Sequence, residues 1–251
     1  AYFSLTACFI GLAVFVGWKV GARSYERSGE VEGPSIGITV GALLSLTGFL
    51  LAFTFSMVNS RFEDRRQTVL IEANAIGTAY LRTDLLPEPK GAEARDLLRQ
   101  YIDRRIVTHA FSSTDPEVDQ MIAESEDLQA ALWAVATEVA QSAPTPISGY
   151  FVQSINEVID VHAVRVIFGT RSTIPNEIWL CLYVLAAVGM AASGFQAANS
   201  GARNVYPTFA LVLTFSAILT IITDLDNPGQ GAMRTDQAPL IDQAALMPPE
   251  T

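Results

Sequence analysis

Three arginines, Arg61, Arg65 and Arg66, follow the second apolar stretch of the chain. Guanidinium groups are permanently charged, so several of them beside a water-filled space raise the local concentration of anions. One interpretation is therefore that these side chains line a vestibule and attract anions. The other is that they are the basic residues that gather at the cytoplasmic edge of a membrane span, paired with Glu63 and Asp64. The residues alone leave both interpretations open.

Two carboxylates, Asp224 and Asp226, directly follow the last apolar stretch. Hard cations such as Ca²⁺ bind clustered oxygen atoms, so one interpretation is a cation-binding turn. The alternative is a simple boundary, at which charged residues lie just outside the lipid. Two carboxylates without further ligands favour the boundary.

Other polar residues lie on predicted helices in the middle of the chain. Asn74 is expected either to bind a neighbouring helix in an oligomer or to face solvent. Asp160 and Arg165 are not separated by the three or four residues of an ion pair on one helix. We therefore expect Asp160 and Arg165 to make structural polar contacts with other helices.

No pattern typical of catalysis, metal binding or cofactor binding occurs in the sequence. Cys8 and Cys181 lie inside apolar stretches, without a C-x-x-C motif, and are interpreted as packing residues. His109 and His162 belong to no H-E-x-x-H motif, and neither a P-loop nor a G-x-S-x-G motif is present. The net charge of −10 argues against a nucleic-acid partner. We therefore expect no catalytic site, no metal and no cofactor.

Four long apolar stretches of the sequence are predicted to form the helices that position these residues. The chain is 50% hydrophobic and 17% charged, whereas a soluble domain is about 25% charged. Each stretch has the ~17–25 residues that a helix needs to cross ~30 Å of hydrocarbon. The first lacks a basic segment before it and is longer than the core of a signal peptide, so it is interpreted as a retained anchor. The predicted spans are Tyr2–Val20, Ile36–Val58, Ile178–Phe195 and Tyr206–Ile222.

The predicted architecture is an all-α membrane protein with two transmembrane hairpins that flank a helical insert. The hairpins cover residues 1–58 and 178–222, and the insert covers residues 59–177. The insert is rich in Ala, Leu, Glu, Arg and Gln, which favours helices, and prolines divide it into four of them. Residues 223–251 form a polar tail, which its prolines predict to be extended or loosely ordered.

One helical stripe continues past the end of the second span. No glycine or proline interrupts residues 49–70, which favours a single helix over Ile36–Thr83. Such a helix is ~70 Å long, with about half in lipid and half in water. The alternative is two helices with a kink near Asn59 and Ser60. The stripe consists of Val69, Ala73, Ile76 and Tyr80.

Three segments of the sequence resemble the bestrophin family and, more narrowly, the bacterial bestrophin-like membrane proteins. They are FLLAFTFSMVNSRFEDRRQTVLIEANAIG, VIDVHAVRVIFGTRSTIPNEIW and TDLDNPGQGAMR. For the narrower family the resemblance covers nearly the whole chain, and LLAFTFS, EANAIGTAYLR and LLPEP are its specific motifs. One residue departs from the pattern, because Thr54 stands where bacterial bestrophins have a basic residue. The matching residues include Phe53, Ser60, Arg61, Phe62, Arg65, Asn74, Asp160 and Arg165.

The resemblance implies a pentameric ion channel whose second span lines a central pore. It places an apolar neck at Ser45, Phe49 and Phe53 and surrounds a vestibule with the helical insert. The spacing of these residues agrees, because i, i+4 and i+8 share one face of a helix. Rings of aromatic side chains are able to close a pore by excluding water. The alternative for Phe49 and Phe53 is ordinary packing or lipid contact.

The resemblance also implies a location in the bacterial inner membrane, with the insert and both termini in the cytoplasm. The expected partners are the lipid bilayer, inorganic ions and further copies of the chain. The acidic composition favours cations, whereas the arginines favour anions, so the ion is left open. The alternative function is a non-conducting scaffold or accessory subunit of a larger membrane complex, docked through the acidic insert and the tail.

Overall fold

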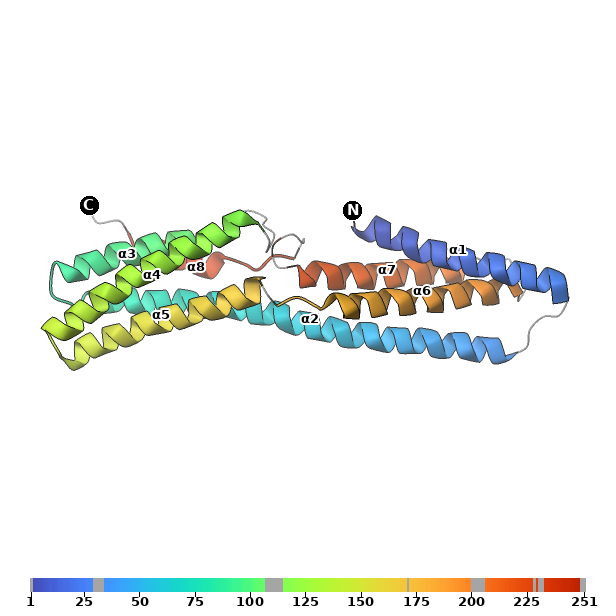
Figure 1. The fold of residues 1–251 in the computed structure, drawn as a ribbon, viewed down its shortest axis with the longest axis horizontal. Helices are drawn as coiled ribbons and strands as arrows, with labels where there is room; N and C mark the ends of the chain where they lie inside the picture. The colour runs from blue at the N-terminus through green and yellow to red at the C-terminus, as the bar shows by residue number, and fades with distance from the viewer. Residues whose placement is uncertain are drawn as a thin grey trace. The chain divides into compact units, whose positions relative to one another are not determined.

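All regular structure in the described part of the chain is helical (Figure 1). The computed structural model describes residues 2–28, 34–106, 115–170, 172–199, 206–227, 229 and 233–248. An all-α fold with four helices long and apolar enough to cross a membrane confirms the predicted fold class. The helices are α1 (Tyr2–Ser28), α2 (Pro34–Thr83), α3 (Lys90–Arg105), α4 (Pro116–Ser142), α5 (Pro146–Thr170), α6 (Asn176–Asn199), α7 (Tyr206–Asp226) and α8 (Ala238–Ala245).

The chain divides into two compact units. The first unit contains residues 1–60 and 174–226, and therefore α1, the first part of α2, α6 and α7. The second unit contains residues 61–173 and 227–251, which include the rest of α2, α3, α4, α5 and α8. The apolar helices thus gather in the first unit and the charged helices in the second.

Helices α1 and α6 approach each other closely in the first unit. A Cβ atom on Gly17 would lie 1.9 Å from the carbonyl oxygen of Ala191, and one on Gly194 would lie 2.1 Å from the carbonyl oxygen of Val14. Only glycine fits at these two positions, because any side chain would overlap the backbone of the other helix. Small residues of this kind allow close packing of transmembrane helices without a hydrophobic driving force.

Helix α2 is one uninterrupted helix of 50 residues. Helical structure continues through Asn59 and Ser60, which confirms the single long helix and not the two-helix alternative. At ~1.5 Å per residue its length is ~75 Å. Val69, Ala73 and Ile76 of the predicted stripe are buried in the core of the second unit.

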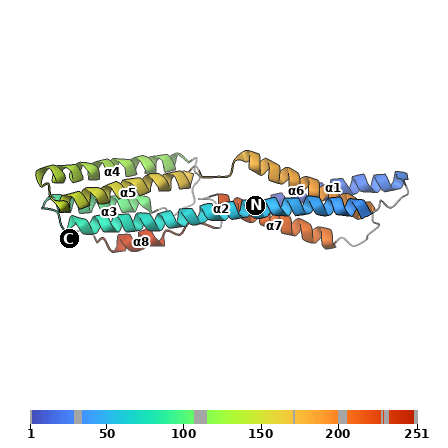
Figure 2. The same cartoon turned by 90° about the horizontal axis from the view of Figure 1, so that it is seen from below.

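The core of the second unit is built from one apolar face of each helix. Figure 2 shows α3, α5 and α8 near the second part of α2, while α4 packs on α3 and α5. Residues one turn apart, such as Leu98 and Ile102 on α3, supply this face, as the spacing predicts. Helix α4 starts at Pro116 with Asp115 as its N-cap residue, because proline suits the first turn of a helix.

The prediction of an extended or loosely ordered tail is wrong for residues 238–245. Residues Ala238–Ala245 form α8, which packs against α3. Pro239 stands in the first turn of the helix, where its missing N–H group and fixed φ start a helix instead of breaking one. Leu240 and Met247 are buried in the core, and Ala244 packs on it, an i, i+4, i+7 pattern.

We predict that Leu240→Ala destabilises the second unit, whereas Leu246→Ala does not. The Leu240 side chain is 0% exposed and that of Leu246 is 71% exposed. Truncation of a buried leucine costs about 2–5 kcal/mol of unfolding free energy, because a cavity remains. The thermal unfolding temperature of the purified protein in detergent should fall clearly for Leu240→Ala alone. Equal unfolding temperatures for the two variants would contradict the packing of α8.

Candidate functional site

The apolar part of α2 has two distinct faces. Thr47, Leu51, Thr54 and Val58 recur at i, i+4, i+7 and i+11 and are all buried within the first unit. This face lies against α6, because a Cβ atom on Gly189 would lie 3.6 Å from Oγ1 of Thr47. The buried face is therefore the one with which a single copy of the chain packs on itself.

The other face of α2 carries the predicted neck residues and is uncovered in a single chain. Ser45 is exposed, and the side chains of Phe49 and Phe53 are 67% and 65% exposed. Each residue turns the helix by about 100°, so this face lies roughly opposite the buried one. Thr54, which departs from the family pattern, is on the buried face, and its hydroxyl donates a hydrogen bond to the Leu50 carbonyl at 2.8 Å.

The three arginines after the span have three different environments. Arg65 is buried, and its Nη2 donates to the Ser172 carbonyl at 3.3 Å. Arg66 is exposed and pairs with Glu63 one turn earlier, at 3.2 Å. Arg61 is half-buried. Of the three, Arg66 therefore presents its charge to solvent, next to a carboxylate that offsets it.

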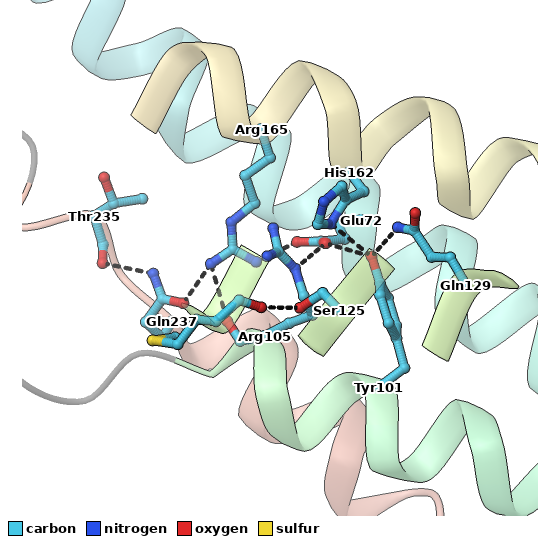
Figure 3. Close-up of polar contacts among 10 residues, drawn as sticks. Glu72, Tyr101, Arg105, Ser125, Gln129, His162, Arg165, Thr235 and Gln237 are labelled. Carbon is cyan, nitrogen blue, oxygen red and sulfur yellow. Dashed lines mark hydrogen bonds and ion pairs between the residues drawn. The ribbon is translucent and has the colours of Figure 1, made fainter. Parts of the chain in front are cut away.

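A buried polar network surrounds Glu72 in the second unit (Figure 3). The Glu72 carboxylate is 0% exposed. Its Oε1 accepts hydrogen bonds from Nε of Arg105 at 2.7 Å and from the hydroxyl of Tyr101 at 3.2 Å. Its Oε2 is paired with Nη1 of Arg165. One carboxylate from α2 therefore joins two side chains of α3 to one of α5.

Further bonds extend this network to α4 and to the segment before α8. Nε2 of Gln129 donates to the Tyr101 hydroxyl at 3.1 Å, and Nδ1 of His162 lies 3.2 Å from the same hydroxyl. Nη2 of Arg165 donates to the Arg105 carbonyl at 3.1 Å and to Oε1 of Gln237 at 2.9 Å. Helices α2, α3, α4 and α5 and the segment before α8 thus share one network.

Burial and the two guanidinium groups determine the protonation of this network. Burial raises the pKa of the Tyr101 hydroxyl well above its usual range, so it is neutral. Burial, together with the nearby charge of Arg105, lowers the pKa of His162 to about 4. His162 is therefore a neutral imidazole near pH 7, and Nε2, its second ring nitrogen, is buried without a hydrogen-bond partner among the described residues.

Other predicted polar residues lie outside this network. Asn74 and Asp160 are exposed, and Asp160 accepts a hydrogen bond from Nδ2 of Asn156 on its own helix at 2.8 Å. The expected contact of Arg165 with another helix is present, because its partner Glu72 lies on α2. Sequence reasoning missed Tyr101, Arg105 and Gln129. These residues could have been found in the sequence, because each is a polar residue at a position where the helical spacing predicts a buried apolar one.

Asp226, one of the two carboxylates after the last span, is hydrogen-bonded within the first unit. Its carboxylate is buried and accepts hydrogen bonds from the backbone N–H of Ile174, at 3.0 and 3.2 Å, and from Nε1 of Trp179, at 3.4 Å. These donors fix the segment that enters α6 to the end of α7. Asp224 is only half-buried. Within the described ranges no three potential ligands among His, Cys, Asp and Glu gather as a metal site.

The comparisons with known proteins identify the family and the fold of the chain. The family model of the Bestrophin-like domain matches residues 5–240, so the chain belongs to the bestrophin-like family. Bestrophins are ion channels, and the chain is thus a membrane protein of an ion-channel family. A comparison with curated protein sequences gives no match.

Solved bacterial bestrophin homologues from Klebsiella pneumoniae share the fold. One single-substitution variant aligns with a TM-score of 0.74 and 13% identity, over 98% of this chain and 100% of its own. Another aligns with a TM-score of 0.72 and 15% identity, over 98% of this chain and 96% of its own. At such low identity the likeness concerns the fold alone.

We predict that Glu72→Gln destabilises the second unit and that Glu63→Gln on the same helix does not. Removal of the buried carboxylate charge leaves Arg105 and Arg165 without a counter-charge, which costs about 3–5 kcal/mol. The exposed pair of Glu63 with Arg66 contributes less than about 1 kcal/mol. Thermal unfolding of both variants measures the difference. An unchanged Glu72→Gln protein would show that the buried network does not stabilise the fold.

We predict that the unfolding free energy decreases as the pH is lowered from about 6.5 to 4, and that His162→Gln removes part of this decrease. The folded state keeps His162 neutral down to about pH 4, whereas the unfolded chain takes up a proton near pH 6.5. The unfolded state therefore binds more protons in this window, and folding loses up to roughly 3 kcal/mol as the pH falls. Unfolding temperatures of wild type and His162→Gln, measured across this range, should converge at low pH. Parallel curves would contradict the prediction.

Proposed function

We propose that the chain forms an oligomeric ion channel in which α2 of each copy lines a central pore. The observation that carries this proposal is the exposed aromatic face of α2, opposite the face on which the chain packs on itself. Membership of the bestrophin-like family supports the same arrangement. Self-association around an axis would bring the Ser45, Phe49 and Phe53 faces of several copies together.

The neck in this proposal works by excluding water. Residues 36–58 of α2 carry no charged side chain. Rings formed by Phe49 and Phe53 make a narrow apolar passage, and such a passage dewets when its radius becomes small. The ring of Ser45 hydroxyls, one turn from Phe49, offers an ion polar contacts beside the apolar rings. The family resemblance favours five copies.

The second unit forms the cytoplasmic part of the channel in this proposal, and the bacterial inner membrane is its location. Of the three arginines after the span, the exposed Arg66 would face a vestibule most directly, and the half-buried Arg61 less so. Arg65 contributes little to it, because its side chain is buried. The partial offset of Arg66 by Glu63 keeps the attraction of anions modest.

We predict that the double variant Phe49→Ala and Phe53→Ala raises ion flux through the protein in liposomes. Removal of two aromatic rings widens the neck and weakens its exclusion of water. Phe55→Ala is the matched control, because Phe55 lies on another face of the same helix and is 39% exposed. Flux measured with a fluorescent ion indicator should rise for the double variant and stay at the wild-type level for Phe55→Ala.

The mass of the detergent-solubilised particle distinguishes this proposal from a scaffold. The chain has a mass of 27.1 kDa, and a pentamer would weigh five times as much. A monomeric or dimeric particle, together with an unchanged flux in the double variant, would reject the channel. The same two results would favour a non-conducting accessory subunit of a larger membrane complex.

A further inference from the structure

A pocket of about 140 Å³ lies entirely within the second unit. It is bounded by α2, α3, α4, α5 and the segment before α8. Four arginines from four of these segments line it, together with a group of apolar side chains, three threonines, one glutamine and two glycines. None of the described lining residues is acidic. The arginines are Arg65, Arg105, Arg165 and Arg234.

The pocket has an excess of positive charge in a protein that is acidic as a whole. Glu72 lies behind the lining and supplies one negative charge beside Arg105 and Arg165. Both of its carboxylate oxygens are bonded to these two side chains, so one carboxylate serves two guanidinium groups. Arg234 adds a further cation at the exposed rim. The chain's net charge is −10, so this local excess does not follow from its composition.

Buried cations are costly unless an anion approaches them. The side chains of Arg105 and Arg165 are only 8% and 14% exposed. Guanidinium groups also have the planar donor geometry that suits a carboxylate. An anionic ligand in this pocket would therefore offset a charge that Glu72 alone only half neutralises.

The apolar part of the lining indicates which chemical group, besides its negative charge, a ligand of this pocket has. Helices α4 and α5 contribute Val118, Met121, Ile122, Val166 and Phe168, which offer no charge and no hydrogen-bonding side chain. An apolar cavity of about 150 Å³ is known to hold a benzene-sized molecule. Ligand pockets commonly combine such apolar walls with a few polar groups that fix orientation.

We propose that this pocket binds a small organic carboxylate with a compact apolar group, about the size of one ring. The carboxylate contacts the arginines, with Arg234 at the rim, and the apolar group lies against α4 and α5. This site is separate from the aromatic face of α2, and its occupancy is measured without any ion flux. The binding proposal can therefore be rejected or supported whether or not the protein conducts ions.

The test is calorimetric titration of the full chain, purified in detergent, with benzoate as the probe. Benzamide has the same ring without the charge, and acetate has the charge without the ring. We expect saturable binding of benzoate and much weaker binding of both analogues. Equal binding of benzamide would reject recognition by the arginines, and equal binding of acetate would reject recognition by the apolar wall. No binding of benzoate at millimolar concentration would reject the site.

Two arginine variants locate the binding site. Arg234→Gln should weaken benzoate binding about tenfold, because one charge-assisted contact is lost. Arg104→Gln should leave it unchanged, because Arg104 is exposed, pairs with Glu124 and does not line the pocket. Arg234 is exposed, so its variant should unfold at the wild-type temperature. Equal weakening by both variants would show that benzoate binds through general charge and not in this pocket.

Discussion

One fully buried carboxylate, that of Glu72, sets the arrangement of the second unit. A charge in such a position is tolerated only when its hydrogen-bonding capacity is filled, and here Arg105, Arg165 and Tyr101 fill it. Each of these donors needs its helix at one rotation and one height, because guanidinium and hydroxyl geometry is directional. Apolar packing is less directional than these hydrogen bonds. The network removes that freedom.

The same network explains why positive charge remains where the pocket lies. Glu72 cannot neutralise two guanidinium groups, and the neutral His162 and Tyr101 supply no further charge. The described lining residues include no second carboxylate that could neutralise the remaining charge. In the proposed site, the carboxylate of the ligand supplies that negative charge. Structure and the proposed binding therefore depend on the same residues.

The sequence predicted what depends on local pattern and missed what depends on contacts between distant segments. The four apolar helices and the continuity of α2 follow from composition and from the stripe through Val69 and Ile76. Helix α8 was missed because Pro239 was counted as a breaker, although at a first turn proline starts a helix. The bond of Glu72 to Arg165 joins residues far apart in the chain, and no spacing rule predicts such a pair. A usable signal existed, since Glu72 lies at i+3 from Val69 and i−4 from Ile76 on the buried stripe.

The proposed neck on α2 is a second case in which the sequence pattern alone was not sufficient. Spacing placed Ser45, Phe49 and Phe53 on one face, but it gave no reason to choose that face over the one with Thr47 and Leu51. In a single copy, the chain buries the threonine-containing face against its own helices. Two large aromatic side chains then remain on the face that the chain does not use. Contact with lipid does not require a polar side chain such as Ser45 beside the two phenylalanines, so their combination supports the proposed shared axis.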